Sequence, residues 1–286
     1  MKFAWLTDIH LNFLDEKQRV NFYQEIVSTN SDAILITGDI AEAPTIAPIM
    51  KEMSNAIQKP IYFVLGNHDY YHATVNSVRT EMVRLTKTNS LLYWLPAWGS
   101  QRLDQDTILL GQDGWADGRL GDYFNSRLTL NDSKMIIDLL HQAIIGKNKL
   151  LDKMQQLADY DAKQLENDLK KSLQQHPKKI IVLTHIPPFK EVCIHKGKIC
   201  DDDYLPYFSS KATGDVLMHN AKENPTIKFL VLAGHTHSES IYKVLPNLTV
   251  KVGKAEYLKP EIQDAIYIVP YKYYKKRNYG SKSITF

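Results

Sequence analysis

Short apolar runs alternate with segments of helical periodicity over the first 70 residues, and this alternation constrains the fold more than any other feature of the sequence. Residues 3–7, 33–37 and 61–65 are nearly continuous apolar runs, which predicts strands buried on both faces. Between them, residues 15–28 and 45–58 place apolar side chains at helical spacing. This β-α-β-α-β order predicts parallel strands, right-handed crossovers and helices on the sheet faces.

The same alternation resumes after a less regular middle region. Further strands are predicted at 107–111, 179–184 and 228–233, short strands that end the sheet in antiparallel fashion at 241–245, 248–252 and 265–269, and helices at 75–87 and 212–223. Residues 129–175 contain little Gly or Pro and predict two helices that meet near Gly146. We therefore expect an α/β protein with a single domain, 1–286, a helical insertion at about 125–176 and a basic tail at about 271–286.

Composition excludes several classes of protein. The chain has 286 residues, of which 44% are hydrophobic and 23% charged, and this balance excludes a disordered chain.

The net charge is +3, from 35 basic and 32 acidic residues. Five of the basic residues lie at 271–286, where there is no acid, so the remainder carries 30 bases against 32 acids. Nucleic acid is therefore not expected as a partner, and the tail is expected to be a solvated extension.

The sequence also bears on the cellular compartment. No apolar run reaches the ~20 residues of a membrane helix. Residues 1–8 reach a carboxylate too early for a signal peptide, and two cysteines are too few for a disulfide framework. We expect a cytoplasmic protein with no membrane contact and no obligate protein partner.

Potential metal ligands follow five of the predicted strands. They are Asp8 and His10, then Asp39, then Asn67 with His68, then His185, and finally His235 with His237. In open α/β sheets, ligands bind outside the carboxyl ends of the strands, so these groups are expected to converge on one crevice. In Asp-x-His and His-x-His an extended backbone points both side chains the same way. Each motif alone is weak evidence, but five in this order indicate a site.

These motifs resemble the signature of the calcineurin-like metallophosphoesterase superfamily: Asp-x-His, Gly-Asp, Gly-Asn-His-Asp, a single His and Gly-His-x-His, in this order. The resemblance spans residues 8–237 and implies two mixed β-sheets packed as a sandwich and flanked by helices, with two metal ions. It implies that one metal is held by Asp8, His10, Asp39 and His237, and the other by Asp39, Asn67, His185 and His235. His68 would then be the catalytic imidazole.

The chemistry of the residues agrees with this resemblance. Carboxylate, carboxamide and imidazole donors without thiolate suit Mn, Fe or Zn. Two such ions can clamp an in-line phosphoryl displacement and supply a bridging hydroxide as nucleophile. Asn67 is a neutral oxygen ligand, and its neighbour His68 is placed to protonate the leaving group or to bind the phosphate. Glu42 is a candidate to orient His68, although a solvated glutamate at a helix start is the simpler interpretation.

Two loops are candidates for substrate contacts. Residues 190–204 follow the strand that leads to His185, so this loop should overhang the site, with His195 or Tyr204 touching substrate. A zinc site or a disulfide at Cys193 and Cys200 is an alternative role for the same loop. Asp113, which follows the strand at 107–111, could line the crevice or belong to an ordinary turn.

Three functions are compatible with the sequence. The leading hypothesis is a metal-dependent phosphoesterase that hydrolyses a monoester or diester of a small or nucleotide-like substrate. The alternatives are a nuclease of the DNA-repair phosphoesterase type, which the slightly acidic body disfavours, and a catalytically inactive metal-binding scaffold, which the complete set of motifs disfavours.

Overall fold

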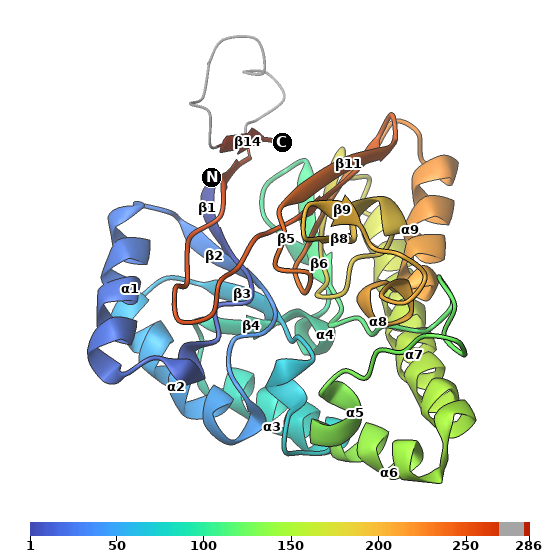
Figure 1. The fold of residues 1–286 in the computed structure, drawn as a ribbon. Helices are drawn as coiled ribbons and strands as arrows, with labels where there is room; N and C mark the ends of the chain where they lie inside the picture. Colours follow the sequence, from blue (N-terminus) through green and yellow to red (C-terminus); the bar gives the residue numbers. More distant parts are fainter. Residues whose placement is uncertain (269–282) are drawn as a thin grey trace.

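Two six-stranded sheets packed face to face form the centre of the molecule (Figure 1). The structure is a computed structural model and describes residues 1–268 and 283–286. Sheet A has the order β14-β13-β1-β2-β3-β4. Its strands are β1 Lys2–Leu6, β2 Ala33–Thr37, β3 Ile61–Val64, β4 Leu92–Trp94, β13 Ala265–Tyr267 and β14 Ser283–Thr285. β1 to β4 are parallel, and β13 runs antiparallel to β1.

Sheet B has the order β11-β12-β10-β7-β6-β5. Its strands are β5 Gln101–Arg102, β6 Thr107–Gly111, β7 Lys179–Leu183, β10 Lys228–Ala233, β11 Ser240–Leu245 and β12 Leu248–Val252. The four central strands are parallel, and the two edge strands β5 and β11 are antiparallel to their neighbours. The expected class, α/β with two mixed sheets flanked by helices, is confirmed.

Alternate side chains of each strand enter different parts of the core. Phe3 and Trp5 of β1 pack between the sheets against Ile181 of β7. Ala4 and Leu6 point the other way, into a cluster with the helices. Because side chains alternate with period two, a strand covered on both faces must be apolar throughout, which explains the continuous runs in the sequence.

Helices cover the outer face of each sheet (Figure 1). α1 Glu16–Ser28, α2 Ala43–Ile57 and α3 Val75–Thr88 pack on sheet A. α7 Lys147–Leu173 and α9 Lys211–Glu223 pack on sheet B. The shorter helical elements are η1 Leu11–Phe13, η2 His68–Tyr70, α4 Leu95–Trp98, α5 Asp132–Met135, α6 Ile137–Ile145, η3 Lys190–Val192 and α8 Leu205–Phe208. None of the helices in the described part of the chain is long and apolar enough to cross a membrane.

The segment between β6 and β7 contains α5, α6 and the long α7. The predicted break at Gly146 is confirmed: this residue separates α6 from α7 and has a φ of 146°. A left-handed backbone of this kind favours glycine. The segment 129–175 thus has one more short helix, α5, than the sequence predicted.

The end of the chain corrects the expectation of a solvated tail. β14 extends sheet A beside β13, and the Phe286 side chain is only 8% exposed. The Lys179 ammonium donates a hydrogen bond of 2.6 Å to a main-chain oxygen of Phe286. Residues 283–286 are therefore docked on the sandwich. The five basic residues of the predicted tail lie outside the described residues.

Candidate metal centre

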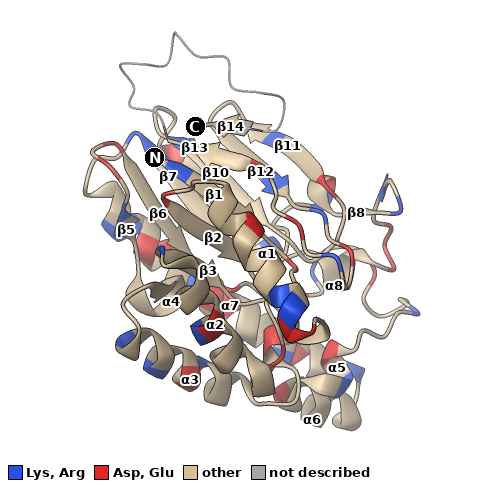
Figure 2. Ribbon diagram, turned by 90° about the vertical axis from the view of Figure 1, so that its left-hand side faces the viewer, with Lys and Arg blue, Asp and Glu red and all other residues tan. Residues whose placement is uncertain are grey.

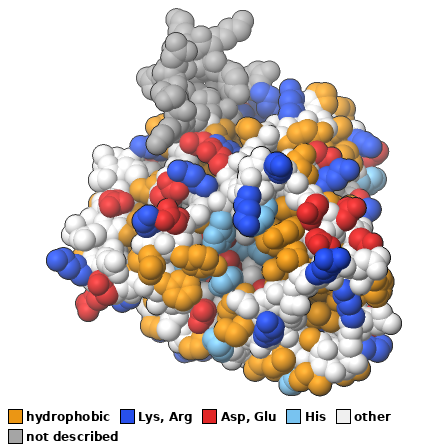
Figure 3. All heavy atoms as spheres, in the orientation of Figure 1, with side chains coloured by type: hydrophobic (Ala, Val, Ile, Leu, Met, Phe, Trp, Pro, Cys, Tyr) orange, Lys and Arg blue, Asp and Glu red, His pale blue; other side chains and the backbone are white. Residues whose placement is uncertain are grey.

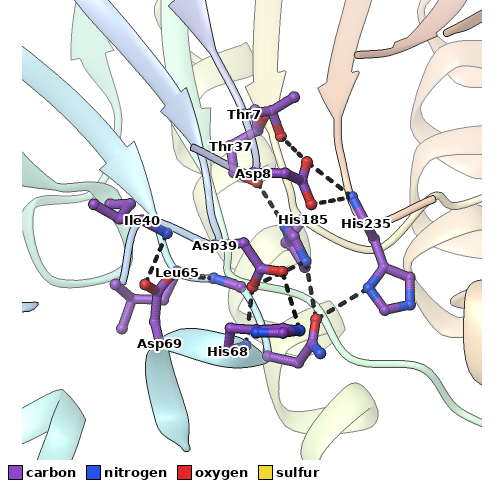
Figure 4. A network of polar contacts seen from close by, with 12 residues as sticks. Thr7, Asp8, Thr37, Asp39, Ile40, Leu65, His68, Asp69, His185 and His235 are labelled. Carbon is purple, nitrogen blue, oxygen red and sulfur yellow. Dashed lines mark hydrogen bonds and ion pairs between the residues drawn. The ribbon is translucent and has the colours of Figure 1, made fainter. Parts of the chain in front are cut away.

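Ligand side chains from both sheets meet where five strands end. Figure 4 shows Asp8, Asp39, His185 and His235 pointing into one space. They follow β1, β2, β7 and β10, respectively. The residues after β3 provide Asn67 and His68 to the same space, and His10 and His237 complete the set. The convergence expected from the order of motifs is thus the observed geometry.

Five of these residues have a left-handed backbone. Their φ angles are 50° for Asp8, 40° for His10, 52° for Asp39, 73° for His235 and 54° for His237. Residues other than glycine rarely adopt this region, and when they do they cluster at functional sites. Here the left-handed steps turn the chain sharply after β1, β2 and β10 and direct these side chains into the shared space.

Glycine at two strand ends makes this close approach possible. A Cβ atom at Gly234 would collide with Thr7 Oγ1 and Asp8 Oδ2. At Gly66 it would collide with Asp39 Oδ1. The motifs need glycine at these positions because a carboxylate lies directly against the backbone.

The first cluster consists of Asp8, His10, Asp39 and His237. One donor atom from each lies within 4.8 Å of all the others. His237 Nε2 is 3.4 Å from Asp8 Oδ1 and 3.5 Å from His10 Nε2, and His10 Nε2 is 3.8 Å from Asp39 Oδ2. Asp8, His10 and Asp39 are buried, so their donor atoms face one another and not solvent.

The second cluster is centred on the side-chain oxygen of Asn67. This atom lies 3.0 Å from His185 Nε2 and 3.0 Å from His235 Nδ1. Asp39 Oδ1 is 3.4 Å from His185 Nε2. Since the other oxygen of Asp39 belongs to the first cluster, its carboxylate faces both.

Neighbouring main-chain oxygens set the orientation of two imidazoles. His185 Nδ1 lies 2.8 Å from the Thr37 carbonyl oxygen, and His235 Nε2 lies 3.0 Å from the Tyr207 carbonyl oxygen. Each of these nitrogens carries a proton to donate, so in a neutral ring the lone pair lies on the nitrogen that faces Asn67. The Asn67 carboxamide is fixed as well, because its nitrogen donates a hydrogen bond of 2.8 Å to Asp132.

The donor set of the second cluster fits a metal ion. Once His185 gives up its second proton, the lone pairs of His185 and His235 and the oxygens of Asn67 and Asp39 are all acceptors, and they face one another. A cation between them resolves that repulsion. Imidazole, carboxylate and carboxamide suit Mn, Fe or Zn, and neither cluster contains a thiolate.

The pKa values follow from burial and from these neighbours. Burial opposes ionisation of Asp39, but His185 and His68 beside it hold its pKa well below the usual value. Burial also disfavours a charged His185, yet Asp39 raises the pKa of this imidazole to about 10. Burial lowers the pKa of His10 to about 4, and burial together with His185 lowers that of His235 to about 4. The Asp39 carboxylate is therefore ionised near neutral pH, the His10 and His235 imidazoles are neutral, and the His185 imidazole is charged in the metal-free protein.

His68 lies beside the clusters. Its main-chain N–H donates to Asp39 Oδ1 at 2.9 Å, and its Nε2 is 3.9 Å from Asp39 Oδ2. Its ring stacks on Tyr71 with centroids 4.3 Å apart. Glu42 does not orient His68: its carboxylate is 3.5 Å from His72 instead.

A cavity of about 450 Å³ opens over the clusters. Among its lining residues are Asp39, Asn67, His68, Asp132, His195, Lys196, His235, His237 and Tyr257. Figure 3 shows the His side chains gathered in a hollow in the middle of this face, with hydrophobic side chains beside it. A small anion can therefore approach the predicted metal ligands from solvent.

The loop at 190–204 reaches this cavity through a two-stranded hairpin, β8 Ile194–His195 and β9 Lys198–Ile199. His195 and Lys196 line the cavity. Tyr204 is not among the lining residues; it stacks on the His195 ring at 4.7 Å and supports it. Cys193 and Cys200 are both buried, and they are free thiols, not a disulfide.

Asp113 corrects an expectation, because it does not line the cavity. It is only 1% exposed, and its carboxylate turns toward sheet A. It accepts hydrogen bonds from the Leu65 N–H, the Trp94 indole and the Tyr70 hydroxyl. Its carboxylate fixes the end of β3, which leads to Asn67, and it has no free access to substrate.

Sequence reasoning missed three residues around the site. Asp69 is buried and accepts the main-chain N–H groups of Ile40, Ala41 and Gly66, which ties two ligand-bearing loops together. Its position directly after His68 was a usable signal. Asp132 and Tyr257, which line the cavity, carry no local motif.

Comparison with known proteins agrees with this geometry. Residues 1–239 match the family model described as calcineurin-like phosphoesterase. Among solved structures, a dimetal phosphatase from Danio rerio is similar with a TM-score of 0.56 and 10% identity, over 88% of this chain and 86% of that one. A phosphopantetheinyl hydrolase from Mycobacterium tuberculosis is similar with a TM-score of 0.53 and 12% identity, over 88% and 89%.

At such identities the two structures show a shared fold. No match was found among curated proteins. The family model covers most of the sequence, including all five ligand motifs. The chain belongs to the calcineurin-like phosphoesterase family.

Proposed function

We propose that this protein is a dinuclear metal-dependent phosphohydrolase that cleaves a phosphate monoester or diester of a small molecule. One observation carries the proposal: the Asp39 carboxylate faces two clusters of donor atoms at once, 3.4 Å from His185 and 3.8 Å from His10. A single structural ion would need only one cluster. Two adjacent ions suit the in-line displacement at phosphorus.

We infer that the candidate ligands of the two clusters hold one ion each and share Asp39. One ion would be held by Asp8, His10, Asp39 and His237, and the other by Asp39, Asn67, His185 and His235. When bound, two such ions neutralise charge on the phosphate and lower the pKa of water so that a nucleophile exists near neutral pH. We infer that they are Mn, Fe or Zn, because the donors are nitrogen and oxygen without sulfur.

The remaining residues of the cavity have roles of their own. His68 is exposed to the cavity beside Asp39, where its imidazole can hydrogen-bond the phosphate or give a proton to the leaving oxygen. Lys196, at the tip of the hairpin, adds a positive charge at the rim. His195 is a further candidate for a substrate contact, held by stacking on Tyr204.

A nuclease is less well supported than a small-molecule enzyme. On the side that faces the viewer in Figure 2, Lys and Arg are interleaved with Asp and Glu along the helices and form no continuous basic stripe. Binding to a phosphate backbone depends on such a stripe. An inactive scaffold is also less well supported, because it would not need His68 in addition to the metal ligands.

Substitution of Asp39 tests the proposal. When supplied with Mn, Fe or Zn, the purified protein should hydrolyse the monoester 4-nitrophenyl phosphate or the diester phenyl 4-nitrophenyl phosphate. Asp39→Asn should lose both the activity and one or both ions, measured by elemental analysis. Asp215→Asn, on the exposed face of α9, is the matched control. Full two-ion occupancy in Asp39→Asn would refute the bridging assignment, and no hydrolysis by the metal-loaded wild type would refute the function.

A further inference from the structure

A second cavity adjoins the metal-centre cavity. It has a volume of about 270 Å³ and lies between the segment 123–133 and helices α6 and α7. Asn67, Leu130 and Asp132 line both cavities. A molecule held by its phosphate at the metal centre can therefore extend into the second cavity, which we call the side cavity.

The walls of the side cavity are largely apolar. They include Trp115, Leu139, Met154 and Ile186, which are all buried. Such a surface favours a hydrocarbon group, because its transfer from water gains free energy in proportion to the apolar area removed. Apolar pockets with few polar groups are typical small-molecule sites.

Most polar side chains that line the side cavity already have partners within the protein; among the described residues, the buried Trp115 indole N–H and the exposed Arg127 guanidinium are exceptions. The Ser126 hydroxyl donates to the Asp203 carbonyl, and the Ser133 hydroxyl donates to the Leu130 carbonyl. The Lys147 ammonium donates to two carbonyl oxygens, and Asp132 accepts from Asn67 and Tyr71. A nucleobase placed here would lose its hydrogen bonds to water and could replace them only in part, for example with the Trp115 N–H, at a cost that a hydrocarbon group does not incur.

We propose that the side cavity binds an alkyl or aryl group that is esterified to the phosphate at the metal centre. The substrate is then a phosphoester of an apolar alcohol. Hydrolysis adds water across one P–O bond of this ester, and the products are an alcohol and a phosphate or phosphomonoester. This inference rests on the proposed function, since it assigns the organic part of the same substrate.

Chain-length dependence gives the test. The metal-loaded protein is assayed on n-alkyl phosphates and on n-alkyl 4-nitrophenyl phosphates with one to eight carbons, so that either ester class is covered. We expect kcat/KM to rise about fourfold per methylene, which corresponds to about 0.8 kcal/mol, until the cavity is filled. The affinity for n-alkylphosphonates, measured by calorimetry, should rise in the same way without turnover.

Filling the side cavity should abolish this dependence. Ala143 lines it from α6, and its neighbour Ile144 is 75% exposed and does not. Ala143→Phe should reduce the total gain across either series to about twofold, and Ile144→Phe, the matched control, should keep the full gain. Ala143→Leu, a smaller change, should give an intermediate gain and replaces Ala143→Phe if thermal unfolding shows that the latter is not folded.

The outcomes separate the two proposals. Hydrolysis of the methyl esters with no dependence on chain length would overturn the side-cavity assignment and leave the phosphoesterase intact. A folded Ala143→Phe protein with the full gain would do the same. If no ester is hydrolysed, the proposed function is refuted. In that case the phosphonate affinities still test the side cavity, and affinities that do not change with chain length would refute its assignment to an alkyl or aryl group.

Discussion

Removal of the Asp132 carboxylate should weaken metal binding without unfolding the protein. Asp132 Oδ1 accepts hydrogen bonds of 2.8 Å from both the Asn67 carboxamide nitrogen and the Tyr71 hydroxyl. The first of these bonds holds the Asn67 oxygen toward His185 and His235. In Asp132→Ala the carboxamide is free to rotate, and binding an ion must first restore its orientation.

The size of the effect follows from the type of hydrogen bond. A bond to a charged group contributes about 1.5–3 kcal/mol, and a neutral one about 0.5–1.5 kcal/mol. Loss of the charged bond therefore predicts a fall in affinity of about 10-fold to 150-fold for the ion at Asn67. Asp132→Asn can still accept a neutral hydrogen bond from Asn67, so its affinity should fall by about tenfold. The first cluster, which does not contain Asn67, should keep its affinity.

Calorimetric titration with Mn or Zn, together with competition by a chelator, measures the two affinities separately. Tyr71→Phe removes the other bond to Asp132 and should change metal affinity by much less. Asp152→Ala, an exposed residue of α7, controls for the loss of an aspartate. Unchanged affinity in Asp132→Ala would refute the reasoning, as would an equal loss at both clusters.

Three further predictions concern the site and the end of the chain. His68→Ala should retain both ions while kcat falls by roughly 10²–10⁴, and a variant without metal would contradict its role beside the clusters. Deletion of 283–286 removes the buried Phe286 side chain, whose burial contributes about 1.5–3 kcal/mol to the free energy of unfolding. The Tm should therefore fall by several degrees in calorimetry, and an unchanged Tm would show that these residues are not docked. Because Asp39 raises the pKa of His185 to about 10 in the metal-free protein, ion binding near pH 7.5 should release about one proton, and affinity should rise about tenfold per pH unit. Titration in two buffers of different ionisation enthalpy counts that proton, and no release would contradict it.

The sequence predicted those parts of the fold that depend on residues close to one another along the chain. The strands β2, β6 and β10 begin and end where they were predicted, since each is a continuous apolar run. The metal-ligand candidates were found for a similar reason: each lies within a few residues of a strand end, and the carboxyl ends of parallel strands share one edge.

Other features depend on contacts that sequence patterns do not reveal. Asp132 meets Asn67 across 65 residues, where the start of α5 lies against the residues that follow β3. Asp113 follows a strand as the ligands do, but its carboxylate turns inward between the sheets and not into the crevice. β14 follows a basic segment that favoured a solvated tail, and its pairing with β13 follows from the open edge of sheet A.

The left-handed backbone of the ligand residues has a consequence for how this protein could change under selection. For a residue with a Cβ atom, that conformation costs of order 1 kcal/mol or more, and glycine avoids the cost. Glycine at Asp8, His10, Asp39, His235 or His237 would therefore relieve strain, while each such substitution would remove a predicted metal ligand. Selection for thermal stability alone would thus favour glycine at these positions as it would at other left-handed positions such as Gln58 and Leu258, but here at the expense of activity. In a directed-evolution experiment, glycine at the candidate ligands together with glycine at those other positions would show that activity is no longer being selected.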